Sequence, residues 1–176
     1  MTKTKWALDP THSSVDFSVK HMMFAKVNGS FNKFDAVIEA DPADLTSADI
    51  EFTIDAASID TRNDDRDVHL RSADFFDTEN YPSITFKSNE ITKTSENEYS
   101  VAGVLTVHGV TRPETFTVTF EGQGKDPWGN EKAGFSVEGK IKRSDFGLTW
   151  NAALETGGVL VGDQINISLQ IQAAKA

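Results

Sequence analysis

The chain has no cysteine among its 176 residues. Disulfide bonds and thiolate metal sites are therefore excluded. A chain of this length can bury a sizeable core without such cross-links. Its stability must come from side-chain packing and backbone hydrogen bonds.

Long hydrophobic runs are also missing. No apolar segment approaches the ~20 residues that a membrane-spanning helix needs. Residues 1–10 lack the apolar core of a secretory signal peptide. We therefore expect no transmembrane segment and a cytoplasmic location, unless a signal peptide has been removed from the chain.

Positive charge is scarce. The chain carries 17 Lys and Arg against 27 Asp and Glu, which gives a formal net charge of -10 at pH 7. The basic residues form no dense cluster. Because nucleic acids and anionic lipid surfaces bind cationic faces, this charge disfavours both as partners.

The sequence does have a strong period of two. In eight segments apolar side chains alternate with mostly polar ones, as Val15, Phe17 and Val19 do with their neighbours. Successive side chains of a strand point to opposite faces, so each segment has one apolar and one hydrated face, which is typical of antiparallel sheets. The predicted strands are 15–20, 34–39, 50–55, 84–87, 101–107, 116–121, 135–141 and 165–172.

Turn signals separate the predicted strands and keep the connections short, which favours up-and-down order. A barrel removes the exposed edges that a sandwich keeps. We therefore predict an all-β fold, an antiparallel eight-stranded barrel, as a single domain over residues 1–176. The turn signals are Asn28-Gly29, Asp41-Pro42, Asn80-Tyr81-Pro82, His108-Gly109, Asp126–Asn130 and Gly157-Gly158.

Residues 61–79 do not alternate. Asn63 is a candidate helix cap, and Leu70 and Ala73 are three residues apart, as on one face of a helix. We predict a short helical insert within residues 62–76 that covers one end of the barrel. The residues expected to pack it against the barrel are Leu70, Phe75 and Phe76.

The inward face of the predicted strands is rich in phenylalanine, with 12 Phe against 2 Tyr and 3 Trp in the chain. Phe brings no polar group that needs a partner, so we expect a dry interior. Met22 is counted among the predicted ligand contacts because methionine adapts to flexible apolar ligands, although it could equally be an ordinary core residue. The residues predicted to bind a ligand are Phe17, Val19, Met22, Phe34, Ile38, Phe52, Ile54, Phe76, Phe86, Leu105, Val107, Phe116, Val118, Phe120, Phe135 and Ile167.

Two glycines, Gly103 and Gly139, share the inward face. Each either bends its strand or leaves room in the lumen. A core filled by side chains and a long apolar ligand cavity therefore both fit the pattern.

Asp9, His12 and Ser13 lie close in sequence and suggest a catalytic triad. A triad needs nucleophile, base and orienting acid within hydrogen-bond reach, and residues of one short turn seldom converge in that way. We therefore predict no catalytic residues and interpret the group as a turn that enters a strand. The four histidines have no paired spacing, so no metal site is predicted either.

Two Arg/Asp pairs stand out, Arg66 with Asp67 and Arg143 with Asp145. Buried or half-buried charges are usually paired, and the loss of one partner leaves the other uncompensated. We predict that all four residues are structural.

Five stretches together resemble the YceI-like family of polyisoprenoid-binding proteins, in order and spacing and nearly end to end. The resemblance implies a lipocalin-like barrel whose long apolar lumen holds an isoprenoid chain or another long-chain lipid. The family has no established catalytic residues, and many relatives carry a secretion signal that this sequence lacks. The stretches are Trp6–Ser13 with Phe17–Met22, Thr61–Asp77, Tyr81–Phe86, Gly103–Pro113 and Arg143–Leu148.

Two classes of function follow. The first is a non-enzymatic carrier of a polyisoprenoid, an isoprenoid quinone or a fatty-acid-like lipid, with no other cofactor and with a homodimer left open. The second is an enzyme that acts on such a chain through the Asp9, His12 and Ser13 group or the Arg66 and Asp67 pair. The absence of a nucleophile–base spacing favours the carrier.

Overall fold

The computed structural model describes residues 3–152, 154 and 160–176, so the turn predicted at Gly157-Gly158 lies outside the described residues. Short 3-10 helices are η1 (Pro10–His12), η2 (Ala56–Ser58) and η3 (Arg143–Phe146), and the α-helix is α1 (Asp64–Arg71). The strands are β1 (Thr4–Leu8), β2 (Ser14–His21), β3 (Ala25–Phe31), β4 (Phe34–Asp41), β5 (Asp44–Asp55), β6 (Ile59–Asp60), β7 (Ser83–Lys93), β8 (Glu98–Val107), β9 (Val110–Lys125), β10 (Glu131–Lys142) and β11 (Val161–Lys175).

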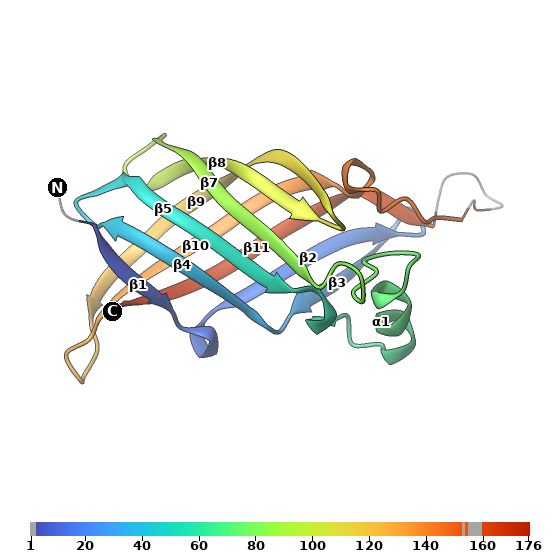
Figure 1. Ribbon diagram of the computed structural model, residues 1–176, viewed down its shortest axis with the longest axis horizontal. Helices are drawn as coiled ribbons and strands as arrows, with labels where there is room; N and C mark the ends of the chain where they lie inside the picture. Colours follow the sequence, from blue (N-terminus) through green and yellow to red (C-terminus); the bar gives the residue numbers. More distant parts are fainter. Residues whose placement is uncertain (1–2, 153, 155–159) are drawn as a thin grey trace.

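The sheet closes on itself (Figure 1). β1 pairs with β4 on one side and with β11 on the other, and the order β4-β5-β7-β8-β9-β10-β11 completes a ring of eight antiparallel strands. Closure pairs strands that would be edges in an open sheet. The predicted eight-stranded antiparallel barrel is confirmed.

Three further strands, β2, β3 and β6, extend the sheet beyond this ring. β11 pairs along one edge with two strands, through residues 173–175 with β1 and through residues 161–170 with β2. β3 follows β2, and the two-residue β6 joins it at Ser30 and Phe31. The sequence prediction lacked β1, β3 and β6, because these strands are short or carry polar and glycine residues that hide the alternation.

One predicted turn is wrong. Asn28 and Gly29 lie inside β3, where Gly29 pairs with Phe17 of β2. The turn is made by residues 22–24, between His21 and Ala25. Gly29 is suited to a strand here because the ring of Phe17 occupies the space that a β-carbon would need.

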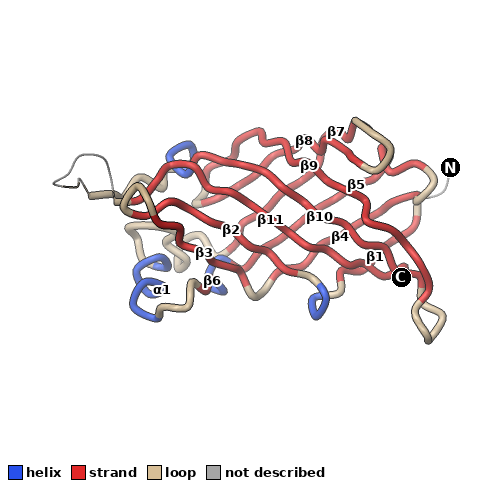
Figure 2. The backbone as a smooth tube through the Cα atoms, turned by 180° about the vertical axis from the view of Figure 1, so that it is seen from behind, coloured by secondary structure: helices blue, strands red, loops and turns tan. Residues whose placement is uncertain are grey.

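The predicted helical insert is confirmed as α1. The side chain of Asn63 caps it by accepting a hydrogen bond from the Arg66 N–H at 3.0 Å. Figure 2 shows the helix at one end of the barrel, near β3 and β6. Leu70 and Phe76 pack against the buried core there, and the Phe76 ring meets that of Phe31 edge-on, with centroids 5.8 Å apart.

The inward side chains form a core along the barrel. Its largest group surrounds Phe146, which is 0% exposed, toward the end that carries α1. A second group around Trp6, Ala133 and Ala173 lies toward the opposite end. No helix in the described part of the chain is long and apolar enough to cross a membrane.

Candidate functional site

A cavity of about 300 Å³ lies inside the barrel. Side chains of the barrel strands, of β2 and of the segment after α1 form its wall, and the accessible part of this wall is entirely apolar. Small-molecule sites are usually apolar cavities of roughly 300–1,000 Å³. A wall whose accessible part is apolar favours hydrocarbon and penalises any polar group that enters without a partner.

Most residues predicted to bind a ligand lie on this wall. Their shared strand phase brings them to one face, because side chains two residues apart point the same way. Whether they bind a ligand remains a prediction. The thirteen that line the cavity are Phe17, Val19, Ile38, Phe52, Ile54, Phe76, Phe86, Leu105, Val107, Phe116, Val118, Phe135 and Ile167.

Three of the predicted residues do not line the cavity. Met22 is 40% exposed, because β2 ends at His21 and the chain turns there. Phe34 stacks on Phe52 with centroids 6.0 Å apart and packs in the core, but it is not among the lining residues. Phe120 packs on Phe135 at 5.5 Å in the group around Trp6.

The prediction also missed cavity-lining residues at both ends of the barrel. Leu70 and Phe75 were expected to pack against the barrel, but not to line its lumen. Others, such as Val101, Ile165 and Leu169, lie on the apolar phase of predicted strands and were left off the ligand-binding set although they line the cavity. The missed residues include Ala40, Leu45, Ala48, Ile91 and Tyr99 toward one end, and Leu70, Phe75, Leu148 and Val161 toward the other.

The two inward glycines accommodate aromatic rings. A β-carbon on Gly103 would collide with the Phe86 ring and the Lys87 carbonyl, and one on Gly139 would collide with the Phe116 ring. The space beside each glycine is therefore filled, so neither glycine enlarges the lumen. The cavity lies beyond these rings, whose other atoms form part of its wall.

Arg143 is a buried cation at the η3 end of the cavity and is 5% exposed. Its guanidinium donates to the carbonyl oxygens of Gly162 at 2.9 Å, Leu148 at 2.6 Å and Val161 at 3.3 Å. Burial lowers the pKa of this group from its usual value, and the nearby Asp163 partly opposes that effect. Arg143 therefore ties together the two ends of the segment between residues 148 and 161.

The predicted pairing of Arg143 with Asp145 is wrong. Asp145 is exposed and makes no ion pair among the described residues, while Arg143 is satisfied by backbone carbonyls. The carboxylate of Asp163 contacts η3: it accepts from the Ser144 N–H at 2.9 Å and from the Ser144 hydroxyl at 2.8 Å. Three backbone carbonyls accept from the guanidinium in place of a carboxylate, so proximity in the sequence misled the prediction.

Arg66 and Asp67 are not paired with each other either; both bind Thr61. The buried Asp67 carboxylate accepts from the Thr61 N–H at 2.9 Å and from its hydroxyl at 2.5 Å. Arg66 donates to the Thr61 hydroxyl at 2.8 Å and to its carbonyl at 2.7 Å. These contacts fix α1 to the chain that leaves β6.

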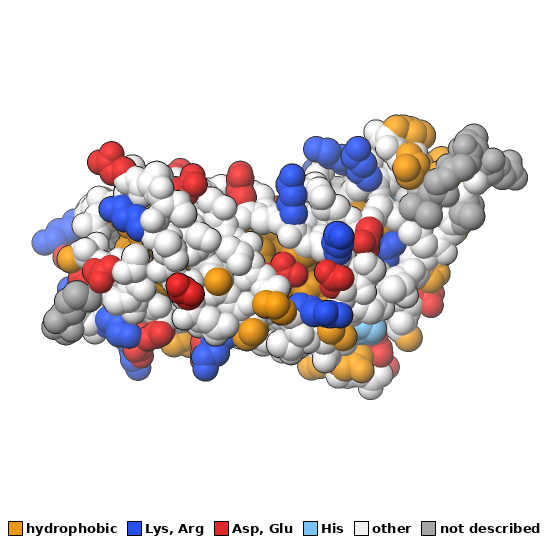
Figure 3. All heavy atoms as spheres, turned by 90° about the horizontal axis from the view of Figure 1, so that it is seen from above, with side chains coloured by type: hydrophobic (Ala, Val, Ile, Leu, Met, Phe, Trp, Pro, Cys, Tyr) orange, Lys and Arg blue, Asp and Glu red, His pale blue; other side chains and the backbone are white. Residues whose placement is uncertain are grey.

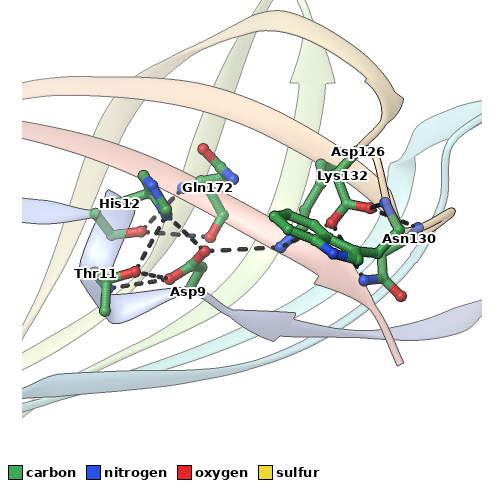
Figure 4. A network of polar contacts seen from close by, with 9 residues as sticks. Asp9, Thr11, His12, Asp126, Asn130, Lys132 and Gln172 are labelled. Atoms are coloured by element: carbon green, nitrogen blue, oxygen red, sulfur yellow. Dashed lines mark hydrogen bonds and ion pairs between the residues drawn. The ribbon is translucent and has the colours of Figure 1, made fainter.

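Asp9, His12 and Ser13 do not form a triad (Figure 4). The Asp9 carboxylate caps η1, contacting His12 Nδ1 at 2.9 Å and accepting from the Thr11 hydroxyl at 2.7 Å. The hydrogen bonds from Thr11 and His12 hold the pKa of Asp9 well below its usual range. Ser13 instead pairs with the backbone of Gln172, accepting from its N–H at 3.0 Å.

The same network reaches the β9–β10 hairpin at this end of the barrel. Lys132 lies 3.7 Å from an Asp9 oxygen and 3.9 Å from an Asp126 oxygen. In the described parts of the chain, no group of three or more His, Cys, Asp or Glu side chains could hold a metal ion.

The comparison with protein families agrees with this architecture. The family model described as a YceI-like domain matches residues 6–173. The chain belongs to the YceI-like family. A UPF0312 protein of Staphylococcus epidermidis is 46% identical over 163 residues, which cover 92% of each chain, and one of Staphylococcus aureus is 44% identical over the same length.

Several solved structures have the same fold. BcnA of Burkholderia cenocepacia superposes with a TM-score of 0.82 at 30% identity, over 94% of this chain and 98% of that one. The Campylobacter jejuni YceI protein gives 0.76 at 35% identity, over 89% and 90% of the two chains. A polyisoprenoid-binding domain of Saccharophagus degradans gives 0.73 at 15% identity, over 98% and 99%, which shows a shared fold.

Proposed function

We propose that this YceI-like chain is a non-enzymatic binding protein that holds one linear apolar lipid, a polyisoprenoid or an isoprenoid quinone, in its barrel. The observation that carries the proposal is the cavity wall, which is apolar throughout its accessible part. The fold shared with a domain named for polyisoprenoid binding supports the choice of ligand.

The geometry also supports a carrier over an enzyme. The nucleophile candidate Ser13 bonds to the Gln172 backbone, and Arg66 and Asp67 are used in fixing α1. None of these groups stands on the cavity wall. A polar head would remain near one end of the barrel, since the accessible wall of the cavity is apolar.

Native mass spectrometry after gentle purification tests the proposal directly. We expect a bound, chemically intact lipid, and its mass would name the ligand. A second measurement is a titration with isoprenoid alcohols of increasing length. Each buried methylene contributes about 0.8 kcal/mol before the entropic cost of ordering the chain, so affinity should rise with length until the cavity is full.

A pair of variants locates the ligand. Ala48 lines the cavity, so Ala48→Leu should weaken binding of the longest isoprenoid first. Val37 is 58% exposed on the outside of β4, so Val37→Leu is a control that should leave the length dependence unchanged. Affinity that does not depend on chain length, or an Ala48→Leu variant that binds like the Val37→Leu control, would refute the proposal.

A further inference from the structure

The turn between β2 and β3 exposes three consecutive apolar side chains. Met22, Met23 and Phe24 are 40%, 54% and 84% exposed. Single exposed apolar residues are common, but a contiguous group of this kind marks an interaction site. Seen from above in Figure 3, hydrophobic side chains gather at the end of the molecule that also carries α1, and Lys and Arg side chains lie near them.

The backbone of this turn is strained. Met22 and Met23 have φ values of 53° and 69°, in the left-handed region that residues with a β-carbon disfavour. Tight hairpin turns usually place Asn and Gly in such positions. The chain therefore keeps two large apolar side chains where smaller residues would suit the backbone better, and strain of this kind is typical of functional sites.

Two lysines lie directly behind the apolar tip. Lys20 of β2 and Lys26 of β3 are exposed and stand opposite each other in the register of the hairpin. Like charges in directly opposed positions are destabilising. Both lysines are exposed, and neither forms an ion pair with any residue in the described ranges.

The turn also adjoins the end of the cavity. Val19, two residues before the end of β2, lines the cavity, as does Val161, the pairing partner of His21. The Met22 N–H donates to the Leu160 carbonyl at 2.8 Å, which ties the turn to the chain entering β11. A surface that contacts this turn is therefore close to one end of the lumen.

We propose that the β2–β3 turn docks the barrel onto a phospholipid bilayer. Met23 and Phe24 enter the acyl boundary, and Lys20 and Lys26 lie at the level of the lipid phosphates, the arrangement that interfacial segments use. The inference deepens the proposed function and rests on it, because a long apolar ligand has to pass between a membrane and the cavity. The net charge of -10 makes the rest of the protein repel an anionic membrane. The contact is therefore reversible and confined to this end.

Vesicle co-sedimentation with phosphatidylcholine vesicles, with and without phosphatidylglycerol, tests the docking. The variant Met22→Asn/Met23→Gly/Phe24→Ser removes the apolar tip with residues that suit a left-handed turn, so it should fold at least as well as the wild type. Burial of Phe24 alone corresponds to roughly a tenfold change in affinity, so we expect at least a tenfold loss of vesicle binding.

Trp128, another strongly exposed aromatic residue, provides a matched control. Trp128 is 82% exposed at the opposite end of the barrel, in the β9–β10 hairpin. Its neighbour Asp126 accepts from the Trp128 N–H, so a carboxylate lies beside it instead of a lysine pair. Trp128→Ser should sediment with vesicles as the wild type does, whereas Lys20→Gln/Lys26→Gln should bind phosphatidylglycerol vesicles more weakly.

Several outcomes would overturn the docking. The first is a wild type that does not sediment with vesicles, and the second is a turn variant that sediments as well as the wild type. The third is a wild-type dimer that becomes a monomer in the turn variant, because the apolar turn would then be a subunit interface. Titration with a soluble isoprenoid alcohol is independent of these results, since the turn variant keeps an intact cavity. Vesicle binding without isoprenoid binding would refute the proposed function and leave the docking in place.

Discussion

The ring of Phe116 on β9 lies so close to Gly139 on β10 that a β-carbon at position 139 would come within 3.0 Å of it. Phe86 lies over Gly103 in the same way and meets the Phe116 ring edge-on, with centroids 5.2 Å apart. Each ring packs directly against a glycine of the neighbouring strand, which has no β-carbon to exclude it. The shape of the cavity wall is thus set by cross-strand contacts between rings and glycines.

A methyl group at position 139 therefore has no room. We expect Gly139→Ala to lower the free energy of unfolding by about 1–3 kcal/mol, as overpacked cores do. Gly124 on β9 is the control, because no atom lies within 4 Å of a β-carbon there. Gly124→Ala should leave stability unchanged or raise it by about 0.4–1 kcal/mol. Urea denaturation of both variants makes the comparison, and equal midpoints would show that the ring can move away.

The packing of these rings against glycines shows which features of the cavity wall the sequence could predict and which it could not. The alternation of Phe86 and Phe116 with polar neighbours fixed their inward direction, because the side-chain period of a strand is two. Gly103 and Gly139 were placed on the correct face, yet their role depends on which residue lies across the strand boundary. The pairing register between strands is a property of the folded sheet. A single sequence therefore could not distinguish a glycine that bends its strand from one that leaves empty space or one that accommodates a ring.

The limits of the prediction at β2 and β3 have a different cause. Asn28-Gly29 has the composition of a hairpin turn, whereas Met22 and Met23 have the composition of a buried strand. Tertiary contacts reverse both preferences, because Phe17 fills the space beside Gly29. The inward face was predictable where a strand was long and regular, although which of its residues, such as Ile165 and Leu169, reach the cavity was not. The wall was also missed where a residue such as Leu148 reaches the lumen from a loop.

The contact of Asp67 with Thr61 should govern the stability of the helical insert. Asp67→Ala leaves the buried Thr61 N–H and hydroxyl without their acceptor, which costs about 1–3 kcal/mol. In a chain of this size we expect a fall in Tm of roughly 2–12 °C, measured by calorimetry. Val68, 60% exposed on the same helix, is the control, and Val68→Ala should change Tm little. If the two variants melt alike, Asp67 is not an anchor.

Trp6 offers a test of an unpaired polar group. Its indole N–H is buried and has no hydrogen-bond partner among the residues that the structure describes. An unsatisfied buried donor is unfavourable by about 1–3 kcal/mol, so Trp6→Phe removes that penalty while it loses some packing. We expect a net change below about 1.5 kcal/mol in chemical denaturation. Leu8→Ala, a plain loss of volume at the next inward position of β1, should cost about 2–5 kcal/mol.

Glu114 should make the barrel less stable at neutral pH than it would be with a neutral side chain. Partial burial, and secondarily the negative charge of Asp145, raise the pKa of this carboxyl group above its usual value. An acid with a raised pKa holds its proton more tightly in the folded state, so its ionisation opposes folding. The destabilisation is fully present above the folded pKa and disappears as the pH falls below the unfolded value of about 4.3.

Glu114→Gln should accordingly raise Tm at pH 7, by a modest amount because the side chain is partly solvated. At pH 3.5 the difference from the wild type should vanish, since both side chains are then neutral. Glu96→Gln, at an exposed position in the β7–β8 hairpin, is the control for the loss of one negative charge from the whole chain. A gain that is the same at both pH values, or one that Glu96→Gln reproduces, would assign the effect to net charge and not to the surroundings of Glu114.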